Sequence, residues 1–254
     1  MPVTGPSPEG RTGRFSLDEL YLGDSLTLLG DLPDGAVDLV VTDPPFAIDF
    51  RPHRNNYHRT GSRVIAGYRE VSPGEYPEFT RSWLAQAYRV LSPSGSLYVF
   101  SGWTRLVDVL QALEETGFSV VNHLIWKYQF GVFTKKKYVT SHDHILFAVK
   151  DPGQYTFNKV EHYPEDVWVV NREYWTGKRK TPTKLPLELV KKILRFSSDP
   201  GDVVLDPFIG SGTVAVAAKG MGRHFLGFEI VEEYFSLARE RLEKTEWGSA
   251  EEGN

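Results

Sequence analysis

The sequence predicts an α/β fold in which helices cover both faces of a mostly parallel β-sheet. Short apolar runs rich in Val, Leu and Phe alternate along the chain with longer stretches whose apolar residues recur at helical spacing. Such alternation is typical of parallel strands joined by crossover helices. The chain has 254 residues, of which 41% are apolar, and this is enough for one large domain with a substantial core.

Each expected element follows from a local pattern. Gly117 ends a helix as a C-cap, and the turn "PSGS" precedes the strand 97–101. A Lys-rich loop joins the strands 120–127 and 142–150, which favours an antiparallel pair. The other expected strands are 37–43, 202–208 and 224–230, and the expected helices are 76–91, 104–116, 185–197, 211–221 and 231–244.

We expect a single domain over residues 16–242, with disordered tails at 1–15 and 243–254. The first tail is rich in Pro, Gly and Ser, and the second is similarly polar. No apolar run is long enough for a transmembrane helix, and no signal peptide pattern is present. These features predict a cytoplasmic protein without a membrane partner.

The chain contains no cysteine, and this excludes several kinds of site. A disulfide framework, a Cys-ligated zinc or iron–sulfur centre and a thiolate nucleophile all require that residue. His142 and His144 share one face of an expected strand, but no third ligand is evident. We therefore expect no metal.

Positive charge is concentrated in loops although the net charge is −4. Residues 51–69 contain five Arg and two His without an acid, and the segments 133–138 and 177–184 are also basic. Such runs are typical of a surface that binds a phosphate backbone. The candidate DNA contacts are Arg51, Arg54, Arg59, Arg63, Lys135, Lys136, Lys137, Arg172, Lys178 and Arg179.

The stretch "DVVLDPFIGSGT" combines a strand, an acid and a glycine turn before a helix. A P-loop would need Lys after its last Gly, and the dinucleotide fingerprint would need a third Gly where Ala215 stands, although Ala is sometimes allowed there. Asp206 would repel a pyrophosphate but suits a cation. Glu229, 23 residues later, is placed to accept hydrogen bonds from ribose hydroxyls. A ribose with a cationic amino acid describes S-adenosylmethionine; the alternative is a plain turn and a helix cap.

The stretch "VDLVVTDPPF" suits methyl transfer to an exocyclic amino group. The nitrogen lone pair of such a group is delocalised, so the group must pyramidalise before it can attack. The carboxylate of Asp43 and the carbonyl of Pro44 can each accept one N–H, and Pro45 stiffens the turn. Phe46 offers a face on which a base can stack, worth roughly 1–3 kcal/mol.

These two motifs together resemble the amino-group DNA methyltransferases that use S-adenosylmethionine. "TDPPF" precedes "DPFIGSGT", which is the order of the family's beta group, and the resemblance covers most of residues 18–242. It implies a Rossmann-like methyltransferase fold with seven mostly parallel strands and one antiparallel strand pair. It also implies S-adenosyl-L-homocysteine as the product.

The resemblance implies two sets of site residues. Lys184 stands one place earlier than in the family's T-x-K-P pattern, so the resemblance assigns it no role. The implied catalytic residues are Asp43, Pro44, Pro45 and Phe46. The implied cofactor contacts are Asp24 (to the adenine), Ser25, Asp43, Thr183, Asp206 (to the methionine end), Phe208, Gly210, Ser211, Gly212, Thr213 and Glu229 (to the ribose).

The target base is expected to be an adenine flipped out of double-stranded DNA. Methylation at carbon 5 of cytosine needs a cysteine, which the chain lacks, and in this family Asp before Pro-Pro usually accompanies adenine N6. Cytosine N4, an RNA adenosine, and a silent nucleic-acid-binding module are the alternatives.

Loops 49–75 and 131–138 are expected to grip the DNA, and 151–180 is expected to form a short target-recognition segment. Its candidate readers are Tyr155, Trp168, Arg172, Tyr174 and Trp175, some of which could instead fold the segment against the sheet. So short a segment suggests a brief recognition site, help from the loop 49–75, or a homodimer in which a second subunit contributes. A cognate restriction endonuclease is the other candidate partner.

Overall fold

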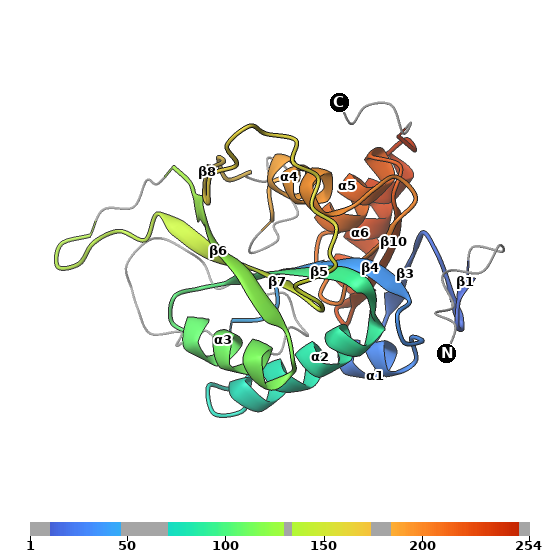
Figure 1. The fold of residues 1–254 in the computed structure, drawn as a ribbon, viewed down its shortest axis with the longest axis horizontal. Coiled ribbons are helices and arrows are strands. Elements are labelled where there is room, and N and C mark those ends of the chain that lie inside the picture. The colour runs from blue at the N-terminus through green and yellow to red at the C-terminus, as the bar shows by residue number, and fades with distance from the viewer. Residues whose placement is uncertain (1–10, 47–70, 130–133, 174–183, 249–254) are drawn as a thin grey trace.

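The computed structural model describes residues 11–46, 71–129, 134–173 and 184–248. In them the chain forms the expected central sheet with helices on both faces (Figure 1). The strand order is β3-β10-β9-β4-β5-β7-β6-β8. Strand β7 runs antiparallel to β5 and β6, and the other neighbouring pairs of this sheet are parallel. The strands are β3 (Glu19–Leu22), β4 (Val37–Thr42), β5 (Leu91–Ser101), β6 (Ser119–Lys127), β7 (His142–Val149), β8 (Val167–Val169), β9 (Val203–Asp206) and β10 (His224–Glu229).

Two groups of helices enclose the sheet, one on each face (Figure 1). One core lies between the sheet and α1–α3 and includes Leu29, Trp83 and Leu113; the other lies beneath α4–α6 and includes Ile193 and Ala238. The helices are α1 (Ser25–Gly30), α2 (Tyr76–Val90), α3 (Leu106–Glu115), α4 (Leu187–Ser197), α5 (Thr213–Gly220) and α6 (Glu232–Glu243).

Residue size explains how α5 fits between the sheet and its neighbouring helices. Its sequence is TVAVAAKG, and Ala215, Ala217 and Ala218 are fully buried. Small side chains let this helix approach the sheet closely, and burial of apolar surface on both sides holds it there. The glycine turn that precedes α5 is therefore tied to a rigid element.

In the described part of the chain the central sheet has eight strands, not the seven implied by the family resemblance. The additional edge strand β8 lies in the segment 151–180, which has no strand pattern in the sequence. It pairs with only three residues of β6, Ile125 to Lys127. Trp168 at its centre is buried, so packing against the sheet stabilises a strand that is too short to be visible as a period in the sequence.

The folded part of the chain extends further at both ends than the predicted 16–242. Residues 11–15 do not belong to a disordered tail, because β1 (Arg11–Thr12) and β2 (Phe15–Ser16) form a small hairpin and the Phe15 side chain is buried against Tyr21 and Phe228. At the other end, Glu243 belongs to α6, and the Trp247 ring lies 5.5 Å from that of His224. Residues 1–10 and 249–254 of the predicted tails lie outside the described residues.

Among the described residues, no helix is both long and apolar enough to cross a membrane.

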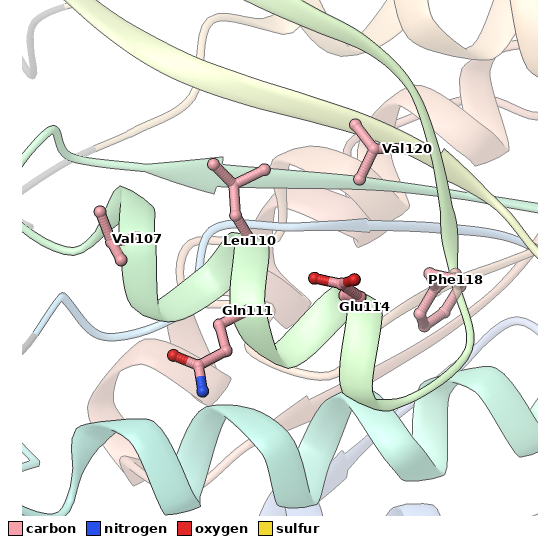
Figure 2. A pocket seen from close by; sticks show the side chains of 6 residues that line it. All are labelled: Val107, Leu110, Gln111, Glu114, Phe118 and Val120. Carbon is pink, nitrogen blue, oxygen red and sulfur yellow. The ribbon is translucent and has the colours of Figure 1, made fainter.

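A shallow pocket lies on the surface between α3 and β6, and Figure 2 shows the side chains that line it. Its lining residues are Val107, Leu110, Gln111, Glu114, Phe118 and Val120. Phe118 immediately precedes β6 and Val120 is the second residue of that strand, so these residues place the pocket at the amino end of the parallel strands and not at their carboxyl end.

The buried Phe15 provides a test of the N-terminal hairpin. Phe15→Ala should lower the free energy of unfolding by about 3–5 kcal/mol, because it leaves a cavity against Tyr21 and Phe228. Arg14→Ala is the matched control; it removes an exposed ion pair with Asp31 and the contact of the guanidinium with the Phe15 ring, and leaves no cavity, so it should cost less than about 2 kcal/mol. Denaturant unfolding measures both, and equal small losses would show that the hairpin does not belong to the folded domain.

Candidate active site

The order of the strands reverses between β4 and β9. The chain runs from β4 to β5 on one side and from β9 to β10 on the other, although β4 and β9 are neighbours. In open α/β sheets, ligands bind beyond the carboxyl ends of the strands at such a point. The two predicted motifs, which begin at Asp43 and Asp206, follow directly at these two strand ends.

A buried hydrogen bond joins the two motifs. Thr42 Oγ1 donates to Asp206 Oδ1 over 2.8 Å, and Phe208 N donates to the same oxygen over 3.0 Å. Asp206 Oδ2 accepts no hydrogen bond from the residues that the structure describes. Burial raises the pKa of Asp206 to about 7, and the charge of Glu229 adds to the rise. A cation at Oδ2 would favour the ionised carboxylate.

The glycine turn after Asp206 has a conformation that other residues rarely adopt. Gly210 and Gly212 have φ of +50° and +81°. A Cβ on Gly212 would lie 2.8 Å from the Cβ of Ala238 in α6, so this helix leaves no room for a side chain there. Phe208 packs on Phe79 and Trp83 of α2, with ring centroids 5.8 and 5.6 Å away. The turn is thus held between helices from both faces of the sheet.

Glu229 fixes the same turn from the end of β10. Its Oε2 accepts a hydrogen bond from Gly210 N over 2.9 Å, and its Oε1 accepts one from Val231 N over 2.8 Å. Each carboxylate oxygen keeps a further lone pair that can accept a hydroxyl hydrogen. Burial raises the pKa of Glu229, and these two backbone hydrogen bonds oppose the rise.

Arg241 is a site residue that the sequence motifs did not indicate. From α6, its Nη1 donates to Ser211 O over 2.5 Å, and to Ser211 Oγ and Thr213 Oγ1 over 3.1 Å each. A guanidinium held in this way fixes both residues that flank Gly212. The sequence did contain a signal for this residue. Arg241 lies at helical spacing after Leu237 and Ala238, so it shares the buried face of an amphipathic helix, where a charged side chain needs a partner.

Asp24 and Ser25 lie at the start of α1, next to Glu229. Asp24 Oδ1 caps this helix by accepting from Thr27 N and Thr27 Oγ1, both over 3.0 Å. The Ser25 hydroxyl donates to Pro207 O over 2.5 Å, and Gly23 N donates to Glu229 O over 2.8 Å. Asp24 and Glu229 therefore lie at adjacent strand ends, as the adenine and the ribose, respectively, of one ligand would require.

Asp43 is partly exposed and carries a raised pKa of about 8. Burial is the main cause, the negative charges of Asp143 and Asp206 add to it, and Arg172 opposes it. Pro44 is buried, whereas Phe46 is partly buried and packs against the core beneath α4–α6. A base placed between Phe46 and Asp43 would meet an acceptor beside an aromatic face.

The structure brings together the predicted residues of both motifs but distributes the predicted DNA contacts differently. Lys135, Lys136 and Lys137 are exposed between β6 and β7. Trp168 is buried, and Tyr155 packs on Phe147, so both fold the segment against the sheet. Arg172 is not a free reader: it pairs with Asp143 at 3.2 Å. Arg51, Arg54, Arg59, Arg63, Tyr174, Trp175, Lys178, Arg179 and Thr183 lie outside the described residues.

Lys184, to which the sequence assigned no role, contacts Glu173 in the segment 151–180 that was predicted to read the DNA. Its ammonium forms an ion pair with Glu173, whose other oxygen accepts a hydrogen bond from Leu187 N over 2.7 Å. Leu187 is the first residue of α4, so Glu173 satisfies a donor at the start of that helix. Within the described part of the chain, no group of three His, Cys, Asp or Glu is arranged to hold a metal ion.

Comparisons with known proteins agree with this geometry. The sequence profile of a DNA methylase family that modifies N6 or N4 amino groups matches residues 37–240. The chain belongs to this N6/N4 DNA methylase family. The type II methyltransferase M.HpaI of Haemophilus parainfluenzae is 30% identical over 243 residues, which are 88% of this chain and 74% of that protein.

Two solved structures place the fold among DNA methyltransferases. The structure of M1.HpyAVI with S-adenosylmethionine is 27% identical, with a TM-score of 0.68 over 88% of this chain and 98% of that one. The cytosine-N4-specific PvuII DNA methyltransferase has a TM-score of 0.72 over 88% of this chain and 85% of that one; at 21% identity, it speaks for the fold alone. This N6/N4 DNA methylase therefore uses S-adenosylmethionine and methylates an amino group of a DNA base.

The contacts of Arg241 predict weaker cofactor binding when they are removed. Arg241→Met should raise the Kd for S-adenosylmethionine about 10- to 100-fold, because each hydrogen bond from a charged donor is worth about 1.5–3 kcal/mol. Arg239→Met, an exposed arginine of the same helix, is the control and should leave the Kd unchanged. Isothermal calorimetry measures both, and equal Kd values for the two variants would contradict the role of Arg241.

The raised pKa of Asp206 predicts that cofactor affinity depends on pH. Only the ionised carboxylate can pair with an ammonium, so affinity should fall as the pH drops through about 7, the pKa of Asp206. Well below pH 7, the expected loss is about tenfold per pH unit. Calorimetry from pH 6 to 8 measures this, and Asp206→Asn should bind weakly without the pH dependence. If the affinity of the wild-type protein did not change over this range, the pairing of Asp206 with the ammonium group of the cofactor would be contradicted.

Proposed function

We propose that this enzyme transfers a methyl group from S-adenosylmethionine to the N6 amino group of an adenine in a specific DNA sequence. The observation that carries the proposal is the position of Asp43-Pro44-Pro45-Phe46 at the switch point, one hydrogen bond away from the turn that begins at Asp206. The chemistry of the first motif suits an amino nucleophile, and that of the second suits a sulfonium cofactor with an ammonium group.

The reaction needs one methyl transfer and the loss of one proton. The lone pair of N6 attacks the methyl carbon, the bond from sulfur to that carbon breaks, and S-adenosylhomocysteine leaves with the electron pair. Asp43 accepts one N–H hydrogen bond and Pro44 O the other, which favours the tetrahedral nitrogen and stabilises its growing positive charge. The surplus proton leaves through Asp43.

The cofactor is assigned to the second motif and its neighbours. Asp206 Oδ2 would hold the ammonium group, since Oδ1 is already occupied by Thr42 and Phe208. Glu229 would accept the ribose hydroxyls, and Asp24 the adenine amino group. The backbone of Gly210 and Gly212 permits close approach because neither residue carries a side chain.

DNA is assigned to the loops beside the carboxyl edge of the sheet. The exposed Lys135, Lys136 and Lys137 would neutralise phosphates, so affinity should depend steeply on salt. The short segment 151–180 would contribute to reading the site, with a second subunit of a homodimer supplying further contacts. The type II relative M.HpaI supports a cognate restriction endonuclease as a functional partner.

The test compares the wild-type protein with Asp43→Ala in a host that lacks DNA methylation. Total DNA is digested to nucleosides, and N6-methyladenine and N4-methylcytosine are quantified by mass spectrometry. The wild type should raise the first product, and Asp43→Ala should lower the rate at least about 10²–10³-fold while cofactor binding persists. Full activity of Asp43→Ala would refute the mechanism.

The other outcomes are equally informative. A rise in N4-methylcytosine alone would keep the mechanism and correct the base. Modified adenosine found only in digested RNA would assign the other polymer. Cofactor binding without any methylated nucleoside would identify a silent binding module.

A further inference from the structure

An ion pair from the recognition segment lies at the same sheet edge as Asp43. Arg172 follows β8, and its Nη2 is 3.2 Å from Oδ2 of Asp143, the second residue of β7. The guanidinium carbon also stacks 3.7 Å from the ring centroid of Tyr128. Arg172 is therefore fixed by a charge and by an aromatic face.

The backbone around Arg172 is anchored on both sides. Before it, the indole of Trp126 donates to Val170 O over 2.8 Å. After it, Glu173 accepts from Leu187 N at the start of α4 and pairs with Lys184. Contacts with β6 and α4 thus hold the residues on either side of Arg172, so its guanidinium is presented in a defined place.

Sheet register puts Asp143 near Asp43. Thr42 is opposite Val99 on β5, and Val99 is opposite Leu146 on β7. Because β7 is antiparallel, its first residues lie at the edge where β4 ends. Asp143 has the same parity as Ile145 and Phe147, which pack in one core with Val41 of β4. The two carboxyl groups therefore lie on one face, two strands apart.

The groups around Asp43 are mostly acidic. Asp206 faces it from the end of β9, Asp143 from β7 and Arg172 from the segment after β8. From α2, Tyr76 is neutral, since burial raises its pKa to about 12; Tyr128, after β6, likewise has a pKa of about 12 because of burial. Arg172 is the group whose positive charge favours the ionised form of Asp43, and Asp143 acts against it.

We propose that Arg172 and Asp143 are positioning residues that set the charge state of the Asp43 carboxylate for methyl transfer. The inference rests on the proposed function, in which Asp43 must be ionised to accept an N–H of the target base. Asp143 holds Arg172 beside the site, and Arg172 supplies positive charge that partly offsets the negative charges around Asp43. The recognition segment therefore contributes to the chemistry as well as to any reading of the DNA.

The test measures kcat/KM for methyl transfer between pH 5.5 and 9 in four variants. Arg172→Gln should move the acid limb of the profile upward by about one pH unit, and activity at pH 7 should fall about tenfold. Asp143→Asn should move the limb downward, and Arg172→Lys should leave it near the wild-type position. Arg105→Gln is the matched control. Arg105 also pairs with an aspartate, Asp108, and lies over a tyrosine ring, that of Tyr76, but its charge is not among those that act on Asp43, so this variant should leave the acid limb in place.

A second readout needs neither cofactor nor DNA. Titration of ¹³C-labelled Asp carboxyl carbons by NMR, with Asp43 assigned through Asp43→Asn, should show its pKa rising in Arg172→Gln and falling in Asp143→Asn. A purely structural role would lower the rate at every pH and leave both the limb and this pKa in place, which would overturn the inference. The inference would also be overturned if the pKa of Asp43 shifted in the same direction in Arg172→Gln and in Asp143→Asn.

Failure of the inference is distinct from failure of the proposed function. A wild-type protein that methylates no nucleic acid overturns both, whereas an active wild type with an unmoved limb overturns the inference alone. If Arg172→Gln does not fold, Asp143→Asn and Arg172→Lys still decide the matter, because the first must shift the limb downward and the second must not shift it.

Discussion

The hydrogen bond from Thr42 to Asp206 is the contact on which the rest of the site depends. It is buried at the switch point and connects the last residue of β4 to the last residue of β9. Thr42 immediately precedes the carboxylate assigned to the base, and Asp206 is the carboxylate assigned to the cofactor. Because this bond ties the two strand ends, neither motif can shift without the other. The distance between nucleophile and methyl donor is thus set by the sheet and not by a loop, which is what a direct transfer between two bound molecules requires.

Burial, and not this hydrogen bond, explains why the protonated forms of the acids in the site are favoured. Asp43, Asp206 and Glu229 are crowded at one edge, where burial raises the pKa of each. A cationic group of a ligand that reaches Asp206 restores the ionised state of that carboxylate. The site therefore favours a ligand that carries a positive charge at Asp206. Elsewhere in the site, the guanidinium groups of Arg172 and Arg241 supply fixed positive charge or hydrogen bonds.

Much of this arrangement could be predicted from the sequence, because the relevant signals are local. The apolar runs before Asp43 and Asp206 identify strands, and the acid-and-glycine pattern identifies the ligand end. What could not be predicted rests on contacts between residues far apart in the chain. Strand β8 is only three residues long and is stabilised by burial of Trp168; Arg241 reaches the turn from another helix; and Arg172 looks like a surface cation until its partner Asp143 is placed. Phe15 stands in a segment of tail-like composition and is buried because β3 and β10, which carry Tyr21 and Phe228, are neighbours in the sheet.

The pairing of β3 with β10 has a consequence for the order of the motifs. β3 pairs with β10, Asp18 accepts a hydrogen bond from His224 Nδ1, and Trp247 lies against the same imidazole, so both ends of the described fold converge on one residue. A short linker could join these ends, and the chain could then be opened at a surface turn between the two motifs without altering any strand neighbour. Such a rearranged protein would carry "DPFIGSGT" ahead of "TDPPF" and keep the same carboxyl edge. The order of the two motifs in the sequence thus depends on where the chain begins and ends, whereas their proximity in space is determined by the order of the strands in the sheet.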